Sequence, residues 1–362
     1  MTEPIDRTRA VRPGESLDLD RLADYLAEHV PELAGQPLEL EQFPSGHSNL
    51  TYLLRAGPTE VVLRRPPFGA NIKTAHDMGR EFRIFAGLHP VFPKVPRPIH
   101  HCADTEVLGA EFYLMERIRG VILRAGSRGR PELPPELMQA LSVNLVDNLA
   151  DIHTVDLGAA GLDNLGKPEG YIRRQLEGWT RRWHAARTDD VPFVDTVLTW
   201  LDAEQPDDPG RGCLIHNDYK YDNVILDPDD LTRIIGVLDW EMATIGDPLM
   251  DLGTTLGYWI TAADPPELQM FPFGPTTLAG NLSRSEVVAR YAERSGLDVS
   301  GILFFYVQAL FKIAVIAQQI YKRYKTGHSK DPRFAMFIEG VKLLFKTANA
   351  AIEAGRLEGF KW

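Results

Sequence analysis

The sequence predicts an α+β fold in which a small lobe built on an antiparallel sheet precedes a larger, mostly helical lobe. Three observations support this prediction. Short alternating segments dominate the first 118 residues, segments with helical periodicity dominate the rest, and one strand-rich segment, 213–240, interrupts the helical part. A loop rich in Gly, Arg and Pro, 124–136, follows the expected boundary, so the predicted domains are 1–118 and 119–362.

The first lobe is expected to begin with a helix over 19–30, where apolar residues recur at helical spacing. Turn residues at 44–46 and 57–58 then separate three strands, as in an antiparallel meander. A second helix and two more strands complete the lobe. The expected strands are 38–43, 50–55, 59–65, 98–102 and 110–118, and the second helix is 75–88.

The second lobe contains seven predicted helices: 136–153, 169–187, 191–204, 248–262, 284–296, 300–325 and 333–354. Its most apolar stretch, 302–317, is 16 residues long and includes Gln308 and Lys312. That is short and polar for a membrane span, so we expect a buried core helix and no membrane partner.

Composition excludes some classes of partner. The chain has 39 Lys and Arg against 50 Asp and Glu, a net charge of −11, which disfavours general nucleic-acid binding. Two cysteines, Cys102 and Cys213, are too few for a disulfide framework, and the N-terminus has no apolar secretory segment. We therefore expect a cytoplasmic protein, and no pattern indicates an oligomeric state.

The strongest chemical signal lies in the strand-rich segment. His216, Asp218 and Asn223 follow the spacing His-x-Asp-x-x-x-x-Asn, and Asp239 comes 16 residues after Asn223 at the end of an apolar run. Phosphoryl transfer needs a carboxylate to accept a hydroxyl proton, and amide and carboxylate oxygens to hold Mg²⁺. Asp218 is the candidate base, and Asn223 and Asp239 are the candidate metal ligands. The alternative is a polar turn that caps helices, but the complete spacing favours catalysis.

The segment from Leu238 to Leu252 resembles the metal-ligand segment of aminoglycoside-phosphotransferase-type kinases, which are relatives of protein kinases. The resemblance covers roughly 38–345 and implies a protein-kinase-like two-lobe fold that uses Mg²⁺ and ATP, with GTP as the alternative. More narrowly, 317–321 and 331–334 resemble the branch whose kinase domain is fused to acyl-CoA dehydrogenases, although no dehydrogenase portion fits in 362 residues.

The resemblance also implies a nucleotide loop between the first two strands, although an ordinary hairpin turn explains that loop equally well. Arg64 stands on the third strand, where these kinases usually carry Lys, and it can neutralise phosphate. Glu81 is its expected ion-pair partner, with a locally paired surface acid as the alternative. The loop residues expected to approach the phosphates are Ser45, Gly46 and Ser48.

Met115 and Glu116 lie where the lobes join, and their backbone groups are expected to bind adenine, although they could serve packing alone. Lys220 follows the base by two residues and is placed to contact the transferring phosphoryl group. The alternative is a solvated loop lysine.

Four further polar residues are expected to have structural roles. His216 should hold the catalytic loop, and His153 should be a satisfied buried histidine. Asp247 precedes Pro248 and should cap a helix. The resemblance implies that Asp251 braces the catalytic loop.

The most favoured function is an ATP- and Mg²⁺-dependent kinase that acts on a hydroxyl group of a small molecule. The alternatives are an aminoglycoside O-phosphotransferase and a nucleotide-binding pseudokinase. Seven residues separate Asp239 from Asp247, which leaves no room for the long activation segment of a protein kinase. The acceptor is expected to be anionic, such as a hydroxy acid or hydroxyacyl-CoA, because 262–362 contains 13 Lys and Arg against 9 Asp and Glu. The alternative for the basic segment 321–333 is a helix end whose cations complement the helix dipole.

Overall fold

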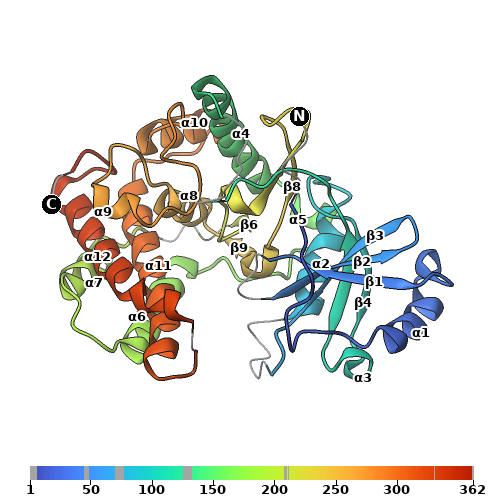
Figure 1. Cartoon of the computed structure of the whole chain (residues 1–362). Helices are drawn as coiled ribbons and strands as arrows, with labels where there is room; N and C mark the ends of the chain where they lie inside the picture. Colours follow the sequence, from blue (N-terminus) through green and yellow to red (C-terminus); the bar gives the residue numbers. More distant parts are fainter. Residues whose placement is uncertain are drawn as a thin grey trace. The chain divides into compact units, whose positions relative to one another are not determined.

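Residues 6–44, 49–69, 77–124, 133–207, 210, 212–329 and 331–360 are described by the computed structural model (Figure 1). The chain forms two compact units, neither of which is continuous in sequence. The first unit comprises Met1–Ile122, Asp156–Leu162 and Asn223–Glu241, and the second comprises Leu123–Val155, Asp163–Asp222 and Met242–Trp362.

A five-stranded antiparallel sheet forms the centre of the first unit, in the spatial order β1-β2-β3-β5-β4. Its strands are β1 (Leu38–Gln42), β2 (Leu50–Ala56), β3 (Thr59–Arg65), β4 (Pro98–Cys102) and β5 (Phe112–Glu116). The β2–β3 hairpin turns at Gly57, whose φ of 57° is a left-handed conformation that glycine adopts readily. The predicted meander is confirmed, and the last strand is shorter than the predicted 110–118.

The two faces of this sheet have different neighbours. Strand alternation puts Leu63 on one face, where it packs in an apolar cluster with Leu22 of helix α1 (Leu19–His29). Arg64 lies on the opposite face, toward helix α2 (Met78–Leu88). Both faces of the sheet are therefore covered, and the Arg64 guanidinium lies on a face that also carries buried apolar residues such as Val62.

A second, two-stranded sheet belongs to the first unit although it comes late in the chain. Strands β7 (Val224–Leu226) and β8 (Ile234–Val237) form an antiparallel hairpin. Val121 and Leu226 exchange backbone hydrogen bonds of 2.9 and 2.8 Å. These bonds tie the hairpin to the strand-rich unit, whereas the predicted division at 118/119 left it with the helical lobe. The short helices α3 (Thr105–Leu108) and α5 (Leu157–Ala160) also lie in the first unit.

Helices make up most of the second unit. They are α4 (Pro135–His153), α6 (Tyr171–Ala186), α7 (Val194–Ala203), α8 (Pro248–Tyr258), α9 (Pro266–Gln269), α10 (Arg284–Ser295), α11 (Ile302–Lys325) and α12 (Phe337–Ala354). All seven predicted helices are present, with ends that differ by a few residues. The strands β6 (Cys213–Ile215) and β9 (Thr244–Gly246) pair with each other. β9 was not predicted, because three residues are too few to show a period.

Helix α11 packs against α6, α8 and α12 in the interior of the second unit. Its length and composition would suffice to cross a membrane, but 78% of its most apolar window is buried inside the structure. That burial is typical of a core helix, as predicted from the sequence.

Candidate active site

The β7–β8 hairpin brings Asn223 and Asp239 together. Asn223 directly precedes β7, and one residue separates the end of β8 from Asp239. Antiparallel pairing therefore puts both residues at the same end of the hairpin. The N–H of Leu238 donates to the carbonyl of Asn223 at 2.8 Å. Amide and carboxylate oxygens are the hard ligands that Mg²⁺ takes, so this pair fits the predicted metal.

Asp239 has a backbone conformation that few residues other than glycine adopt, with a φ of 66°. Trp240, the next residue, is fully buried, and its indole N–H donates to the carbonyl of Val237 at 3.0 Å. The turn after β8 is therefore held firmly. The Asp239 side chain keeps 31% of its surface exposed, so its carboxylate is accessible to a ligand.

Arg64 connects this turn to the sheet. Its Nη2 lies 2.6 Å from Oδ1 of Asp239, and its Nε lies 3.4 Å from Oε2 of Glu81 on α2. Glu81 is fully buried, so it is the expected partner of Arg64 and not a surface acid. The contact with Asp239 was not predicted.

Three carboxylates converge on the Arg64 guanidinium, from Glu81, Asp239 and Glu241. Burial alone lowers the pKa of Arg64, but the three carboxylates outweigh it and raise this pKa, so Arg64 stays charged. Burial raises the pKa of the Glu81 carboxyl, against the attraction of Arg64. A divalent cation at Asp239 would offset this concentration of negative charge, which is further evidence that the site fits a metal.

Two residues of this cluster were not identified from the sequence, Glu241 and Asn49. Oε2 of Glu241 lies 3.5 Å from Nη2 of Arg64 and accepts a hydrogen bond of 2.8 Å from Nδ2 of Asn49. The position of Glu241 two residues after Asp239 was a signal that could have identified it. Asn49 is the last residue of the predicted nucleotide loop, 44–49, but no role was assigned to its side chain. The loop residues Ser45, Gly46 and Ser48 lie outside the described residues.

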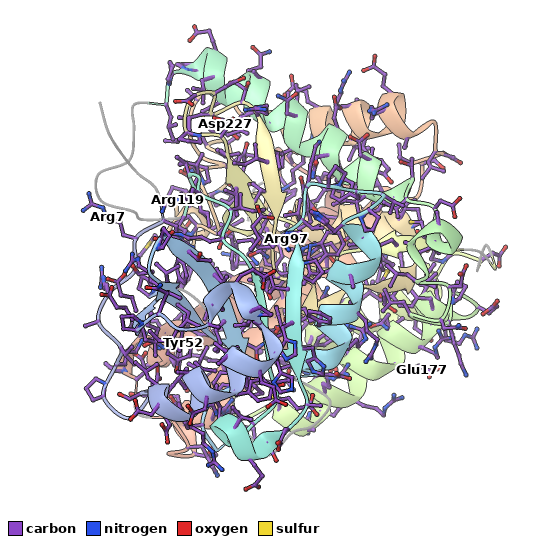
Figure 2. All side chains as sticks on the ribbon, turned by 90° about the vertical axis from the view of Figure 1, so that its right-hand side faces the viewer. Arg7, Tyr52, Arg97, Arg119, Glu177 and Asp227 are labelled. Atoms are coloured by element: carbon purple, nitrogen blue, oxygen red, sulfur yellow. The ribbon has the colours of Figure 1, made fainter. Side chains whose placement is uncertain are left out.

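Met115 and Glu116 end strand β5, where adenine binding was expected. Met115 is buried between two strands, opposite Val62 of β3 and Pro98 of β4. The N–H of Glu116 donates to the carbonyl of Arg97 at 2.8 Å (Arg97 is labelled in Figure 2). This N–H is thus already used within the unit, and adenine binding here stays a prediction.

In the second unit, Asp218 forms an ion pair with Lys220, and both side chains are partly exposed. The N–H of Asp218 donates to Nδ1 of His216 at 3.2 Å. The Lys220 ammonium also lies 4.9 Å from the centre of the Tyr258 ring. Two contacts therefore hold Lys220 beside the predicted base, and its contact with the transferring phosphoryl group stays a prediction.

Asp251 of α8 braces the catalytic loop, as the resemblance implied. Its fully buried carboxylate accepts hydrogen bonds from the N–H groups of His216 at 2.6 Å and Asn217 at 2.7 Å. His153 is buried and satisfied, as predicted, because its ring nitrogens meet Asp251 at 3.1 Å and the Tyr291 hydroxyl at 2.6 Å. Asp247 caps α8 by accepting from the N–H of residue 249 at 2.7 Å.

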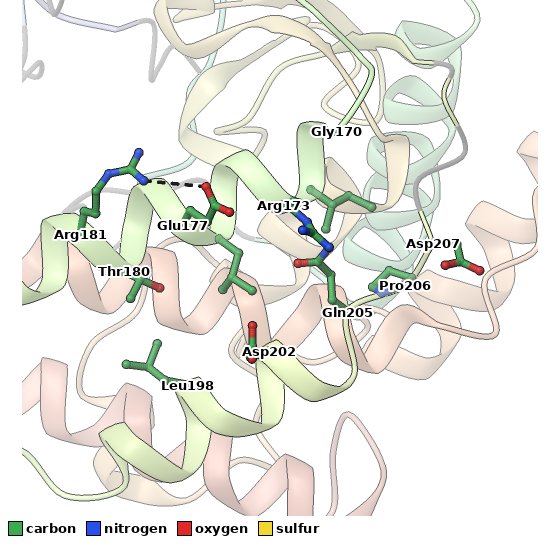
Figure 3. A pocket seen from close by; sticks show the side chains of 12 residues that line it. Gly170, Arg173, Glu177, Thr180, Arg181, Leu198, Asp202, Gln205, Pro206 and Asp207 are labelled. Atoms are coloured by element: carbon green, nitrogen blue, oxygen red, sulfur yellow. Dashed lines mark ion pairs between the residues drawn. The ribbon is translucent and has the colours of Figure 1, made fainter.

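A groove of about 660 Å³ lies between α6 and α7 (Figure 3). Charged residues of both signs line this groove, and in one ion pair Nη1 of Arg181 lies 3.9 Å from Oε2 of Glu177. None of the predicted site residues that the structure describes lines this groove.

The basic segment at the end of α11 has local partners. Lys325 lies 2.6 Å from the Asp189 carboxylate, and Lys322 donates to the carbonyl of Ala185 at 2.6 Å. Carbonyls at the end of a helix attract cations, so Lys322 interacts with the C-terminal end of α6, whereas Lys325 is held by a carboxylate. Arg323 is exposed.

Comparison with known proteins finds relatives over most of the chain. Residues 39–282 match the phosphotransferase enzyme family. The rat (Rattus norvegicus) protein acyl-CoA dehydrogenase family member 11 is 34% identical over 341 residues, which cover 90% of this chain and 42% of that protein. The chain therefore spans less than half the length of the curated relatives that it matches.

Solved structures of phosphotransferases have the same fold as this chain. A protein from Ralstonia eutropha, provisionally named an aminoglycoside phosphotransferase, is 28% identical with a TM-score of 0.76, over 92% of this chain and 97% of that one. An aminoglycoside phosphotransferase in complex with AMP-PNP and hygromycin B is 17% identical with a TM-score of 0.59, over 92% and 98% of the two chains. The predicted kinase-like fold is confirmed.

Proposed function

Because the chain belongs to the phosphotransferase enzyme family, we propose that it transfers the γ-phosphoryl group of ATP to a hydroxyl group of a small molecule, with Mg²⁺ as cofactor. The observation that carries the proposal is the meeting of Asn223, Asp239 and Arg64 at one end of the β7–β8 hairpin. Two of these residues offer oxygen ligands to a metal, and the third offers a permanent positive charge to phosphate. A structural relative crystallised with AMP-PNP supports the use of a nucleotide.

In the proposed reaction, the acceptor hydroxyl oxygen forms a bond to the γ-phosphorus. The bond from that phosphorus to the oxygen bridging the β-phosphate breaks, and ADP leaves. Asp218 accepts the hydroxyl proton. Bound Mg²⁺ would neutralise charge on the phosphate oxygens, and Arg64 and Lys220 supply fixed positive charge to the nucleotide and the transferring group.

A coupled assay of ADP release with a panel of hydroxyl compounds tests the proposal. Asp218→Asn removes the proton acceptor and keeps the side-chain shape, so turnover should fall about 10²- to 10⁴-fold while the nucleotide Kd changes less than about twofold. Asp229→Asn, at an exposed carboxyl, is the control and should turn over at the wild-type rate. A pseudokinase would instead bind nucleotide and release no ADP in response to any acceptor.

For the acceptor we propose an anionic hydroxy compound, such as a hydroxy acid or hydroxyacyl-CoA. The net positive charge of 262–362 suits an anion and disfavours a polycationic aminoglycoside. The name of the rat relative refers to acyl-CoA, which supports the same class of acceptor. Because Lys325 is already paired with Asp189, the exposed Arg323 is the cation on which this part of the proposal depends most.

Arg323→Gln should raise the KM for the acyl substrate about tenfold, and the matched Lys325→Gln should raise it less because Asp189 already offsets that charge. Turnover of kanamycin-like amines, with none of hydroxyacyl compounds, would instead identify the second candidate, an aminoglycoside phosphotransferase. The provisional name of the Ralstonia eutropha protein favours that candidate.

A further inference from the structure

Lys312 is a charged residue in the apolar interior of the second unit. It lies in the middle of α11 and is 3% exposed. Lysine is almost never buried to this extent unless it has partners, because the ammonium loses its water. Burial lowers its pKa to about 8, although Asp218 of the catalytic loop and Asp251 of α8 favour the charged form, while Lys220 of the loop opposes it. The position of Lys312 therefore needs an explanation beyond packing.

The partners of Lys312 connect α11 to the catalytic loop. Its Nζ donates to the carbonyl of Asn217 at 2.8 Å and to Oγ1 of Thr254 on α8 at 3.4 Å. The Thr254 hydroxyl donates its own proton to the carbonyl of Met250 at 2.9 Å, so its oxygen can accept from Lys312. The stronger contact is thus the one to the loop carbonyl.

Asn217 leads directly to the proposed base. Its φ is 67°, a conformation that costs free energy for any residue except glycine and that needs external support. Its N–H donates to Asp251 at 2.7 Å. In the peptide between Asn217 and Asp218, the oxygen accepts from Lys312 and the N–H donates to His216. Both polar groups of that peptide are therefore held.

We infer that Lys312 is a positioning residue for phosphoryl transfer, whose ammonium fixes the Asn217 carbonyl, and with it the direction of Asp218. The inference rests on the proposed function, in which Asp218 is the base. Lys312 acts through the loop and contacts neither nucleotide nor acceptor.

Lys312→Met tests the inference, because methionine keeps most of the length and removes both charge and donor. The kcat should fall about 10- to 100-fold while the KM for ATP changes less than about threefold. Hydrogen exchange at the Asp218 N–H should become faster.

Gln318→Met is the matched control. Gln318 lies on the same helix, is fully buried and donates to the carbonyl of Ala186 at 3.1 Å, which is outside the catalytic loop. This variant should lose stability and keep the wild-type kcat and the wild-type rate of hydrogen exchange at Asp218.

A Lys312→Met protein with the wild-type kcat and unchanged hydrogen exchange at Asp218 would overturn the inference, as would losses no larger than those of Gln318→Met. If the wild-type protein releases no ADP with any acceptor, the proposed function fails, and exchange at Asp218 still decides whether Lys312 holds the loop. If Lys312→Met does not fold, Lys312→Gln, which keeps a donor without charge, is measured in the same way.

Discussion

The guanidinium of Arg64 lies 2.6 Å from the carboxylate of Asp239, although 175 positions separate the two residues in the chain. Arg64 also contacts the buried Glu81. A residue expected to bind nucleotide phosphate therefore also sets the position of the proposed metal ligand. Metal binding would weaken this ion pair, because the carboxylate would then share its charge with a second cation.

Arg64→Lys should raise the KM for ATP about tenfold and lower kcat, because an ammonium is a point charge and cannot hold Glu81 and Asp239 together as a planar guanidinium does. Arg65→Lys is the control, since Arg65 is buried and donates to the carbonyl of Leu108 at 3.1 Å. It should reduce the melting temperature and leave the KM for ATP unchanged. Steady-state kinetics with varied ATP measure both. Equal kinetics for the two variants would contradict a nucleotide role for Arg64.

Removal of Mg²⁺ should weaken ADP binding about tenfold in the wild-type protein and less than about twofold in Asp239→Asn, which lacks the carboxylate ligand. Calorimetric titration of ADP with and without Mg²⁺ measures the effect. Asn223→Asp keeps an oxygen ligand at the other position and should retain the response to Mg²⁺. A full response in Asp239→Asn would show that the metal has other ligands.

Asp251 should stabilise the folded protein in a pH-dependent way. Burial raises the pKa of its carboxyl, but His153 and the N–H of His216 outweigh burial and lower this pKa below its ordinary value of 3.8. The stabilisation is therefore complete above that value and is lost as the pH falls through the lower folded-state pKa.

Asp251→Asn should lower the free energy of unfolding by about 3 kcal/mol near pH 7, because it leaves part of a buried network unpaired. Urea denaturation across the acid range should show the difference from the wild type shrinking below about pH 4. A difference that stays constant down to low pH would mean that the charge of Asp251 does not contribute.

The buried Lys312 should also make stability rise with pH, but in the alkaline range. Its folded-state pKa of about 8 lies below the ordinary 10.5, so between these values the unfolded chain binds more protons and stability rises with pH. As the pH rises across this range, the free energy of unfolding of the wild type should therefore increase by up to about 3 kcal/mol relative to that of Lys312→Met. Comparing the two proteins cancels the titration of the tyrosines. Parallel pH profiles would contradict a buried, titrating Lys312.

Short-range patterns explain why part of the site could be predicted. The alternation in Thr59–Arg65 determines both β3 and the face that carries Arg64, and the first turn of the next helix supplies Glu81. The spacing from Asp218 to Asn223 is likewise local.

Contacts created by tertiary folding could not be predicted in the same way. The approach of Arg64 to Asp239 depends on how a hairpin late in the chain returns to the first sheet. Lys312 stood out in the sequence only as an interruption of an apolar stretch. Nothing in its neighbours along the chain indicates that its ammonium meets the carbonyl of Asn217.

The late arrival of the β7–β8 hairpin also affects how the protein is made. The ribosome adds about 120 residues between Ile122 and Glu241, which takes on the order of 10 s at cellular translation rates. During that interval the backbone groups of Val121 lack Leu226 and the guanidinium of Arg64 lacks Asp239, although all five strands of the main sheet have already been synthesised. Co-translational completion of the first unit must therefore wait until the loop that carries Asp218 has been synthesised.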